Sequence, residues 1–287
     1  AFYYSIRGKR KDERPPDVGP HSIWWAHYDA WSTYWRRLSW LMTDIDLHAE
    51  TAVLCRNRDL CPDTVRPLFE RQIGFQYIPE SYFPACTVED GALWLHGHRY
   101  TAVSGDKALF PDAAHPEVSA LEPDCRCDPP QPMLRCASFN KEGRTCWLLV
   151  NEGNTPIKTR LTLPVDAPLC RYDLWSGQPY ACPAERTAKG ACLPLELPAR
   201  GSLLLFTCTA RESEALPLPP TYLSLAAPAF ALADEDAAHL TKTYRATLQI
   251  TATELQTATP LLTLPGQEMA ELTVNGQPAG VSFWPPH

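Results

Sequence analysis

An apolar stripe with the period of an α-helix begins soon after the start of the chain. Its members recur at steps of three and four residues, the spacing that brings side chains onto one helix face. Ser22 stands where a hydroxyl can cap the first turn. The pattern therefore predicts a long amphipathic helix that packs an aromatic face against a sheet or barrel. The stripe consists of Trp24, Tyr28, Trp31, Trp35, Leu38, Met42 and Ile45.

Short strand-like runs and a second helix follow this stripe. Residues 51–55 form an apolar, β-like run, residues 63–78 carry a helical pattern, and residues 86–95 hold two more short runs. Helix, strand, helix and strand in succession predict an α/β layer with parallel pairing. Between residues 103 and 134 the periodicity fades and six prolines occur, which predicts a linker.

From Met133 the chain is patterned as β-structure. Apolar runs recur about every ten residues, with turn pairs such as Glu142-Gly143 and Ser176-Gly177 between them. This spacing is typical of a small β-sandwich. The expected strands cover residues 134–139, 146–150, 157–163, 170–174, 192–197 and 203–206.

The last part of the chain is a separate β-rich segment. Prolines between residues 217 and 220 set it apart from the sandwich, and strands are expected at 244–250 and 270–274. Asn275-Gly276 follows the second of these strands. Because this pair adopts positive φ angles readily, it predicts a tight β-hairpin.

Composition and charge narrow the classes of function. The chain has 287 residues and a mass of 32.1 kDa, room for two or three domains. Lys and Arg number 26 against 33 Asp and Glu, a net charge of −7. No positive field draws phosphate backbones or anionic lipids, so we expect neither nucleic acid nor a membrane as partner. The nine tryptophans suit carbohydrate as a ligand, although they are equally ordinary core residues.

The cysteines indicate a reducing compartment. The chain has 11 of them, an odd number scattered among apolar neighbours, which we interpret as buried, reduced thiols of a cytoplasmic protein. Cys125-Arg126-Cys127 and His96-Gly97-His98 are metal-like spacings, but neither has the second matched pair that a zinc site needs. We expect no metal site, and we expect His96 and His98 to share the solvent face of one strand.

A charged loop at residues 7–21 holds most of the candidate substrate-binding groups. Its prolines exclude a helix. Arg7 and Arg10 can donate paired hydrogen bonds to sugar hydroxyls or to a carboxylate. The alternative is a salt bridge that only shapes the loop, and no residue is assigned as catalytic. The candidate substrate-binding residues are Arg7, Arg10, Asp17, His21 and Trp25.

Motifs in most parts of the chain resemble segments of one group of known proteins. They include Phe2-Tyr3-Tyr4-Ser5-Ile6-Arg7-Gly8-Lys9-Arg10, Phe75-Gln76-Tyr77-Ile78-Pro79-Glu80, Asp173-Leu174-Trp175-Ser176-Gly177 and Val274-Asn275-Gly276-Gln277-Pro278. Together they resemble bacterial glycoside hydrolases related to family 106, the α-L-rhamnosidase group. The resemblance implies an α/β plus all-β chain: a flavodoxin-like layer similar to the glutamine amidotransferase fold, then a β-sandwich and a partial galactose-binding-like jelly roll.

The same resemblance implies four parts. Residues 1–21 are a barrel-end segment with the charged loop, 22–124 the flavodoxin-like domain, 125–212 the small sandwich and 213–287 the jelly-roll segment. Most of the barrel, some strands of the flavodoxin-like layer and the end of the jelly roll are missing, so we expect a piece cut from a longer protein. No cofactor is expected from the residues, and only the resemblance implies a bound calcium ion.

The expected function is that of a non-catalytic, C-terminal accessory region of a multidomain glycoside hydrolase that acts on carbohydrate, such as α-L-rhamnosides. A stand-alone carbohydrate-binding or scaffold protein is the alternative. A third hypothesis, an amidotransferase, needs a cysteine nucleophile with a histidine partner. Cys55 follows a strand, but Arg56-Asn57-Arg58 lacks the small residues of such a turn. The sugar, the stereochemical outcome and the oligomeric state stay open.

Overall fold

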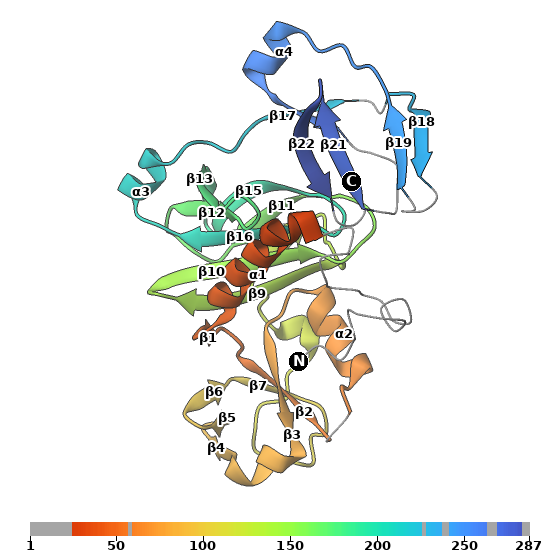
Figure 1. The fold of residues 1–287 in the computed structure, drawn as a ribbon. Coiled ribbons are helices and arrows are strands. Elements are labelled where there is room, and N and C mark those ends of the chain that lie inside the picture. Colours follow the sequence, from red (N-terminus) through yellow and green to blue (C-terminus); the bar gives the residue numbers. More distant parts are fainter. Residues whose placement is uncertain (1–24, 57–58, 226–227, 237–240, 263–268, 283–287) are drawn as a thin grey trace. The chain divides into compact units, whose positions relative to one another are not determined.

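The computed structural model describes residues 25–56, 59–225, 228–236, 241–262 and 269–282. The chain forms two compact units, one of residues 34–218 and one that combines residues 1–33 with 219–287. Strands far outnumber helices in the described residues, so the chain is β-rich, as its alternating patterns predict (Figure 1). No helix in these ranges is long and apolar enough to cross a membrane.

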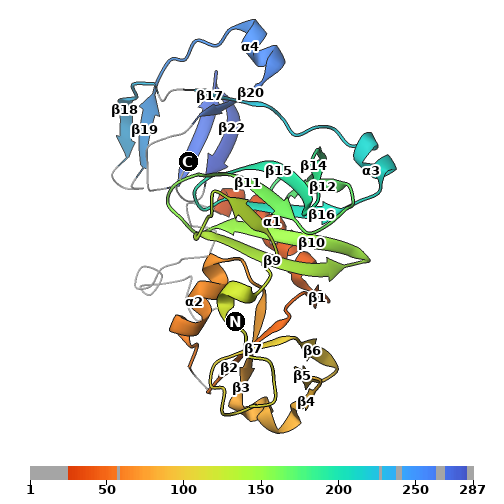
Figure 2. The same cartoon turned by 180° about the vertical axis from the view of Figure 1, so that it is seen from behind.

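The larger unit contains an antiparallel β-sandwich, seen from two sides in Figure 1 and Figure 2. One sheet has the strand order β1-β9-β10-β16-β12-β13 and the other the order β14-β15-β11-β8. All neighbouring pairs are antiparallel. The strands are β1 (Asp46–Leu47), β8 (Arg126–Asp128), β9 (Leu134–Lys141), β10 (Arg144–Asn151), β11 (Ile157–Leu163), β12 (Leu169–Asp173), β13 (Gln178–Cys182), β14 (Glu185–Thr187), β15 (Gly190–Leu197) and β16 (Ser202–Thr207).

The core of the sandwich follows from the alternation along its strands. β11 alternates between buried and solvent-facing side chains along its length, which is how a strand with one face on the core is patterned. Trp147 and Leu205 from the six-stranded sheet meet Leu161 and Leu193 from the four-stranded sheet. The six strands predicted in this region are confirmed, each to within two residues at either end.

Helix α1 (Tyr28–Met42) supplies part of a second core, on the six-stranded sheet. Its residues Tyr34, Leu38 and Leu41, together with Ile45, pack against strand residues such as Phe139. Trp35 and Met42 belong to the predicted stripe but are 48% and 38% exposed, whereas Leu41 is buried. The predicted stripe is therefore confirmed at Leu38 and Ile45 and wrong at Trp35 and Met42, because the packed face is turned toward Leu41. A short 3₁₀ turn, η2 (Trp25–His27), precedes α1, and Ser22 and Trp24 lie outside the described residues.

A parallel three-stranded sheet forms the α/β part of the larger unit. β2 (Thr51–Cys55) lies between β3 (Phe75–Pro79) and β7 (Ala102–Ser104), and both pairings are parallel. Every residue of β2 is buried, which explains its continuous apolar run. Helix α2 (Pro62–Glu70) connects β2 to β3. Parallel pairing is found as predicted, but between other strands. β2 pairs with residues 75–79, which were predicted as helix, and with residues 102–104. The predicted strands within residues 86–95 pair antiparallel in a separate sheet.

The predicted helix at 63–78 is wrong in its second half. α2 ends at Glu70, Gln72 takes a positive φ of 54°, and residues 75–79 form β3. Gly74 makes this reversal possible, because a Cβ there would lie 2.6 Å from the carbonyl oxygen of His48. The β-branched and aromatic residues of β3 favour a strand once the helix has ended.

A small antiparallel sheet follows β3 and the 3₁₀ segment η3 (Glu80–Ala85). It contains β4 (Thr87–Glu89), β5 (Ala92–Leu95) and β6 (His98–Tyr100). His96 and Gly97, with φ of 48° and 82°, make the turn between β5 and β6, and His98 Nε2 lies 3.0 Å from the carbonyl oxygen of Ala49. The expectation that His96 and His98 share one strand face is wrong, because the turn removes His96 from the strand.

Two short elements complete the larger unit. η4 (Val118–Ala120) lies within residues 103–134, which also contain the end of β7 and all of β8. The prediction of a linker there is therefore wrong, because the segment contains short elements and Ala113 is buried in a hydrophobic core. Helix α3 (Ala210–Ala215) begins with a capping box in which Thr209 and Glu212 satisfy each other's backbone N–H groups.

The described part of the smaller unit contains three two-stranded sheets. The pair β17–β20 is parallel, and the pairs β18–β19 and β21–β22 are antiparallel. Asn275 and Gly276 have φ of 51° and 79°, which confirms the predicted hairpin turn. The predicted strand at 244–250 ends at Arg245. The elements are β17 (Tyr222–Leu225), β18 (Ala231–Asp236), β19 (Thr241–Arg245), α4 (Ala252–Thr257), β20 (Thr259–Leu262), β21 (Ala270–Val274) and β22 (Gln277–Ser282).

Candidate functional site

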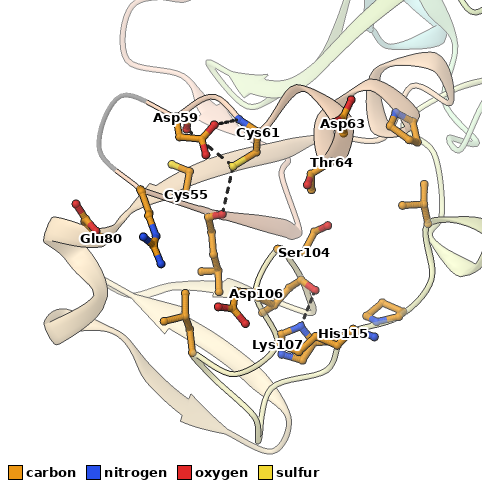
Figure 3. A pocket seen from close by; sticks show the side chains of 18 of the residues that line it. Cys55, Asp59, Cys61, Asp63, Thr64, Glu80, Ser104, Asp106, Lys107 and His115 are labelled. Atoms are coloured by element: carbon orange, nitrogen blue, oxygen red, sulfur yellow. Dashed lines mark hydrogen bonds between the residues drawn. The ribbon is translucent and has the colours of Figure 1, made fainter.

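A cavity of about 730 Å³ lies at the carboxyl ends of β2 and β7 (Figure 3). Ligands of open α/β sheets bind at this edge, because the loops that leave neighbouring strands part there and form a crevice. Leu54 and Val103, both buried, contribute an apolar floor. The volume is within the range of small-molecule sites. The cavity is therefore the candidate functional site of the larger unit.

The first wall is the turn between β2 and α2. Asp59 accepts a hydrogen bond from the backbone N–H of Cys61 at 2.9 Å, the local bond by which Asp stabilises a turn. Cys61 takes a left-handed backbone conformation, with φ of 45° and ψ of 56°, and α2 begins at the next residue. Tyr77 on β3 supports the turn through its hydroxyl, which donates to the carbonyl oxygen of Leu60 at 3.0 Å.

The second wall is the segment that follows β7. Gly105 has a φ of +116°, and a Cβ there would lie 2.9 Å from the carbonyl oxygen of Leu54, so only glycine lets the chain pass so close to β2. His115 holds the far end of this segment, since its two ring nitrogens lie 3.0 Å from the carbonyl oxygen of Val103 and 2.9 Å from that of Phe110. The wall is a structured loop with two fixed ends.

Carboxylates dominate the charge of the cavity. Figure 3 shows Asp59 on one side and Asp106 and Lys107 on the other. Every one of the charged lining residues is exposed to solvent. Sugar hydroxyls both donate and accept, so they match carboxylates beside an ammonium group. The charged lining residues are Arg56, Asp59, Asp63, Glu80, Asp106, Lys107 and Glu117.

The two thiols of the cavity are not activated as nucleophiles. Burial raises the pKa of the Cys55 thiol, and the nearby Cys61 and Asp59 raise it further. Burial and Asp59 likewise raise the pKa of Cys61. A nucleophilic cysteine needs the opposite change, and both ring nitrogens of His115 are already engaged with backbone carbonyls. The cavity therefore lacks the Cys–His pair that an amidotransferase requires.

The described part of the chain contains no candidate metal-binding site. In residues 25–56, 59–225, 228–236, 241–262 and 269–282 no group of three or more His, Cys, Asp or Glu side chains is placed to hold a metal ion. Cys125 is buried inside the sandwich, and His96 and His98 are separated by a turn.

The predicted substrate-binding residues can be placed only in part. Arg7, Arg10, Asp17 and His21 lie outside the described residues. Trp25 is 46% exposed, and its ring stacks on Tyr28 with 5.5 Å between ring centroids.

Sequence reasoning missed the cavity, which is lined by residues between Leu54 and Val118. The signal was present, because polar and glycine residues follow two neighbouring strands at Asp59 and at Ser104-Gly105-Asp106. Interpreting residues 103–134 as a linker concealed it.

Comparison with known proteins identifies a shared fold. No protein family and no curated protein matches the chain. A rhamnosidase from Novosphingobium sp. PP1Y is similar in structure, with a TM-score of 0.58 and 11% sequence identity, covering 95% of this chain and 36% of that one. The chain thus spans about a third of that rhamnosidase and shares the fold of the part it covers.

Two further structural similarities are weaker. A GH27 β-L-arabinopyranosidase from Geobacillus stearothermophilus has a TM-score of 0.23 and 17% identity, covering 30% of this chain and 20% of that one. α-Galactosidase I from Mortierella vinacea has a TM-score of 0.22 and 21% identity, covering 32% of this chain and 25% of that one. Both scores are too low to support an argument.

Proposed function

We propose that this chain is the C-terminal accessory region of a multidomain glycoside hydrolase that acts on carbohydrate, with α-L-rhamnosides as the expected substrates. The observation that carries the proposal is the fold shared with a rhamnosidase over 95% of this chain but only 36% of that protein. Hydrolysis needs two carboxyl groups held across the scissile bond. We place those groups in a catalytic barrel outside this chain.

Within this proposal the parts keep the divisions expected from the resemblance. The strand order β3-β2-β7 is second, first, third in chain order, as at the start of a flavodoxin-like sheet, and it supports a flavodoxin-like domain at 22–124. Residues 125–212 are the sandwich domain, and 213–287 are part of a galactose-binding-like jelly roll. We place the protein in the cytoplasm and relate it to glycoside hydrolases of family 106.

The test compares this chain with the longest natural protein that contains it. Both are assayed with an aryl α-L-rhamnopyranoside and with the matching aryl α-galactoside. We expect the longer protein to hydrolyse the rhamnoside and the 287-residue chain to release no aryl alcohol above the blank. Hydrolysis by the chain alone refutes the accessory role, and a longer protein inactive on every glycoside tested refutes the hydrolase assignment.

A second candidate function is carbohydrate binding by the chain itself, and the cavity at the ends of β2 and β7 favours it. Among the residues that the structure describes, Lys107 makes no hydrogen bond or ion pair, so its ammonium group is available to a ligand. Asp59 and Asp106 offer acceptors from the two walls. The arrangement resembles the polar lining by which small sites orient an uncharged ligand.

Titration calorimetry tests this candidate. L-Rhamnose, D-galactose and their methyl glycosides are titrated into the chain, into Lys107→Ala, and into Lys158→Ala as control. Lys158 lies on β11 and pairs with Glu196 at 2.7 Å, so it has no part in the cavity. Binding that Lys107→Ala weakens at least tenfold and Lys158→Ala leaves unchanged supports the candidate. Flat titrations with all four sugars exclude it for these ligands.

A further inference from the structure

Two buried cysteines of the sandwich lie in direct contact. The Sγ atoms of Cys170 and Cys208 are 2.6 Å apart, closer than the roughly 3.5 Å or more at which unbonded atoms pack. Cys170 is fully buried, and Cys208 is 9% exposed. Both are free thiols in this structure.

The strand register explains why these two thiols meet. Cys170 on β12 lies opposite Phe206 on β16, so a residue two positions further along the partner strand faces the same side of the sheet. That residue is Cys208, and its backbone N–H donates to the carbonyl oxygen of Pro168 at 2.9 Å. The ladder therefore continues past the end of β16 and holds the two side chains together.

Several other cysteines make different contacts. In the described residues, Cys86 and Cys146 direct their thiols at backbone carbonyls, and the sulfur of Cys192 accepts from Arg160. Cys125, Cys127 and Cys136 form a second group whose thiols interact with one another. The pair on β12 and β16 is thus distinguished by its close sulfur–sulfur approach, and the second group is the natural competitor in any experiment.

We propose that Cys170 and Cys208 are a redox-active pair that closes a disulfide when the chain meets an oxidising thiol–disulfide couple. In the reducing cytoplasm the pair stays as two thiols. The oxidant is a small disulfide such as glutathione disulfide. This proposal is independent of the carbohydrate function proposed above.

The chemistry balances as two successive thiol–disulfide exchanges. The thiolate of Cys208, the more accessible residue, attacks one sulfur of the oxidant; a mixed disulfide forms and one small thiol leaves. Cys170 then attacks the Cys208 sulfur, and the second small thiol leaves. One reagent S–S bond is broken and one protein S–S bond is made, and the two protons lost by the cysteines end on the released thiols.

The bond would cross-link β12 to the chain that enters α3. The cap residue of α3, Thr209, directly follows Cys208. Glu212 in the first turn of α3 pairs with Arg144 on β10 at 2.6 Å. Since the closed loop spans 38 positions, it restricts the unfolded chain considerably. We expect the oxidised protein to unfold at a temperature higher by roughly 5–15 °C.

The test is a non-reducing peptide map. The chain is refolded from denaturant in a glutathione redox buffer, which gives the oxidant access to thiols that are buried after folding. Free thiols are then blocked with iodoacetamide and the protein is digested with trypsin. Cleavage after Arg160, Arg171, Arg200 and Arg211 places Cys170 and Cys208 on separate peptides, residues 161–171 and 201–211, each with a single cysteine.

We expect these two peptides to appear joined and to separate on reduction. Before alkylation, the intact mass should be about 2 Da below that of the reduced protein, because the disulfide forms with loss of two hydrogens. Cys208→Ser should lose both the joined peptide and the rise in unfolding temperature. Cys146→Ser, which removes another buried thiol from the neighbouring strand β10, should keep them. Carbamidomethyl groups on both Cys170 and Cys208 after refolding, or a cross-link confined to Cys125, Cys127 and Cys136, would overturn the proposal.

Discussion

Asp124 is the buried carboxyl group that should make the stability of the larger unit depend on pH. Burial raises its pKa to about 7 and the nearby Glu50 adds to the rise, although backbone N–H groups of Gly74 and Ser138 act against it. Its Oδ2 atom is buried without a hydrogen-bond partner in the described structure. An ionised carboxylate there is poorly solvated, so the folded chain favours the protonated form.

The size of the effect follows from linkage between ionisation and folding. The ordinary pKa of this group is 3.8, and one pKa unit corresponds to about 1.4 kcal/mol. Below pH 3.8 the group is protonated in both the folded and the unfolded state and does not lower folding stability. As the pH rises to about 7 the unfolded chain loses its proton while the folded chain retains it, so folding stability falls by about 4 kcal/mol in total. Roughly 3 kcal/mol of that loss lies between pH 5 and pH 8.

The perturbation is Asp124→Asn, which keeps the size of the side chain and removes its ionisation. Urea unfolding of the unaltered chain and of this variant is measured at pH 5 and pH 8. We expect the unaltered chain to lose about 3 kcal/mol relative to the variant over that interval. Asp166→Asn, at an exposed residue paired with Arg186, should show no such difference. The reasoning is refuted if the unaltered chain and Asp124→Asn differ in free energy of unfolding by the same amount at both pH values. It is also refuted if the unaltered chain becomes more stable relative to the variant between pH 5 and pH 8.

Three further substitutions test the packing, each by urea unfolding. Gly190→Ala places a Cβ 2.0 Å from the carbonyl oxygen of Leu163 and should lower folding stability by more than about 3 kcal/mol. The control Gly143→Ala has no atom within 4 Å of its Cβ and should lose only about 1–2 kcal/mol, because its φ is positive. Equal losses in the two variants would contradict this prediction. Leu205→Ala should cost about 2–5 kcal/mol because its side chain is fully buried in the sandwich core, and a loss below about 1 kcal/mol would show that the core readjusts. Asn151→Asp replaces an amide that donates to three backbone carbonyls. An ionised carboxylate cannot donate to them, so the variant should lose more stability relative to the unaltered chain at pH 8 than at pH 4. A loss of stability that is independent of pH would contradict this prediction.

The β-sandwich is the part of the fold that its sequence predicts best. Ile157–Leu163 alternates between a buried and a solvent-facing side, and the other predicted strands are apolar runs separated by turn pairs, a pattern that can be recognised before the pairing is known. Four short strands of the sandwich escaped prediction, namely Asp46–Leu47, Arg126–Asp128, Gln178–Cys182 and Glu185–Thr187. Glu185–Thr187 contains no buried residue, and Gln178–Cys182 is interrupted by Pro179.

The α/β part was harder to predict because tertiary contacts decide it. Tyr34 and Leu41 define the packed face of α1, while the larger Trp35 lies at its exposed flank, and hydrophobicity alone ranks the tryptophan higher. β3 follows directly on a helical pattern, and the boundary is set by the left-handed Gln72 together with Gly74.

The candidate site was missed for a related reason. Its two walls are separated by β3 and by the small antiparallel sheet that follows it, so no local motif joins Asp59 to Asp106. Only the parallel pairing of β2 with β7 brings the two walls together. The residues predicted from the charged loop lie mostly outside the described residues, so that part of the prediction stays open.

The pairing of β1 with β9, Asp46 opposite Asn140, has a consequence for synthesis on the ribosome. The chain leaves the six-stranded sheet after Leu47 and supplies its remaining strands only between residues 134 and 207. At about 5–20 residues per second, the roughly 160 residues from Leu47 to Thr207 take about 8–30 s to emerge. For that interval the apolar side of α1 has no sheet to cover it, so the nascent chain should be a client for chaperones that shield exposed apolar helices until β16 is complete.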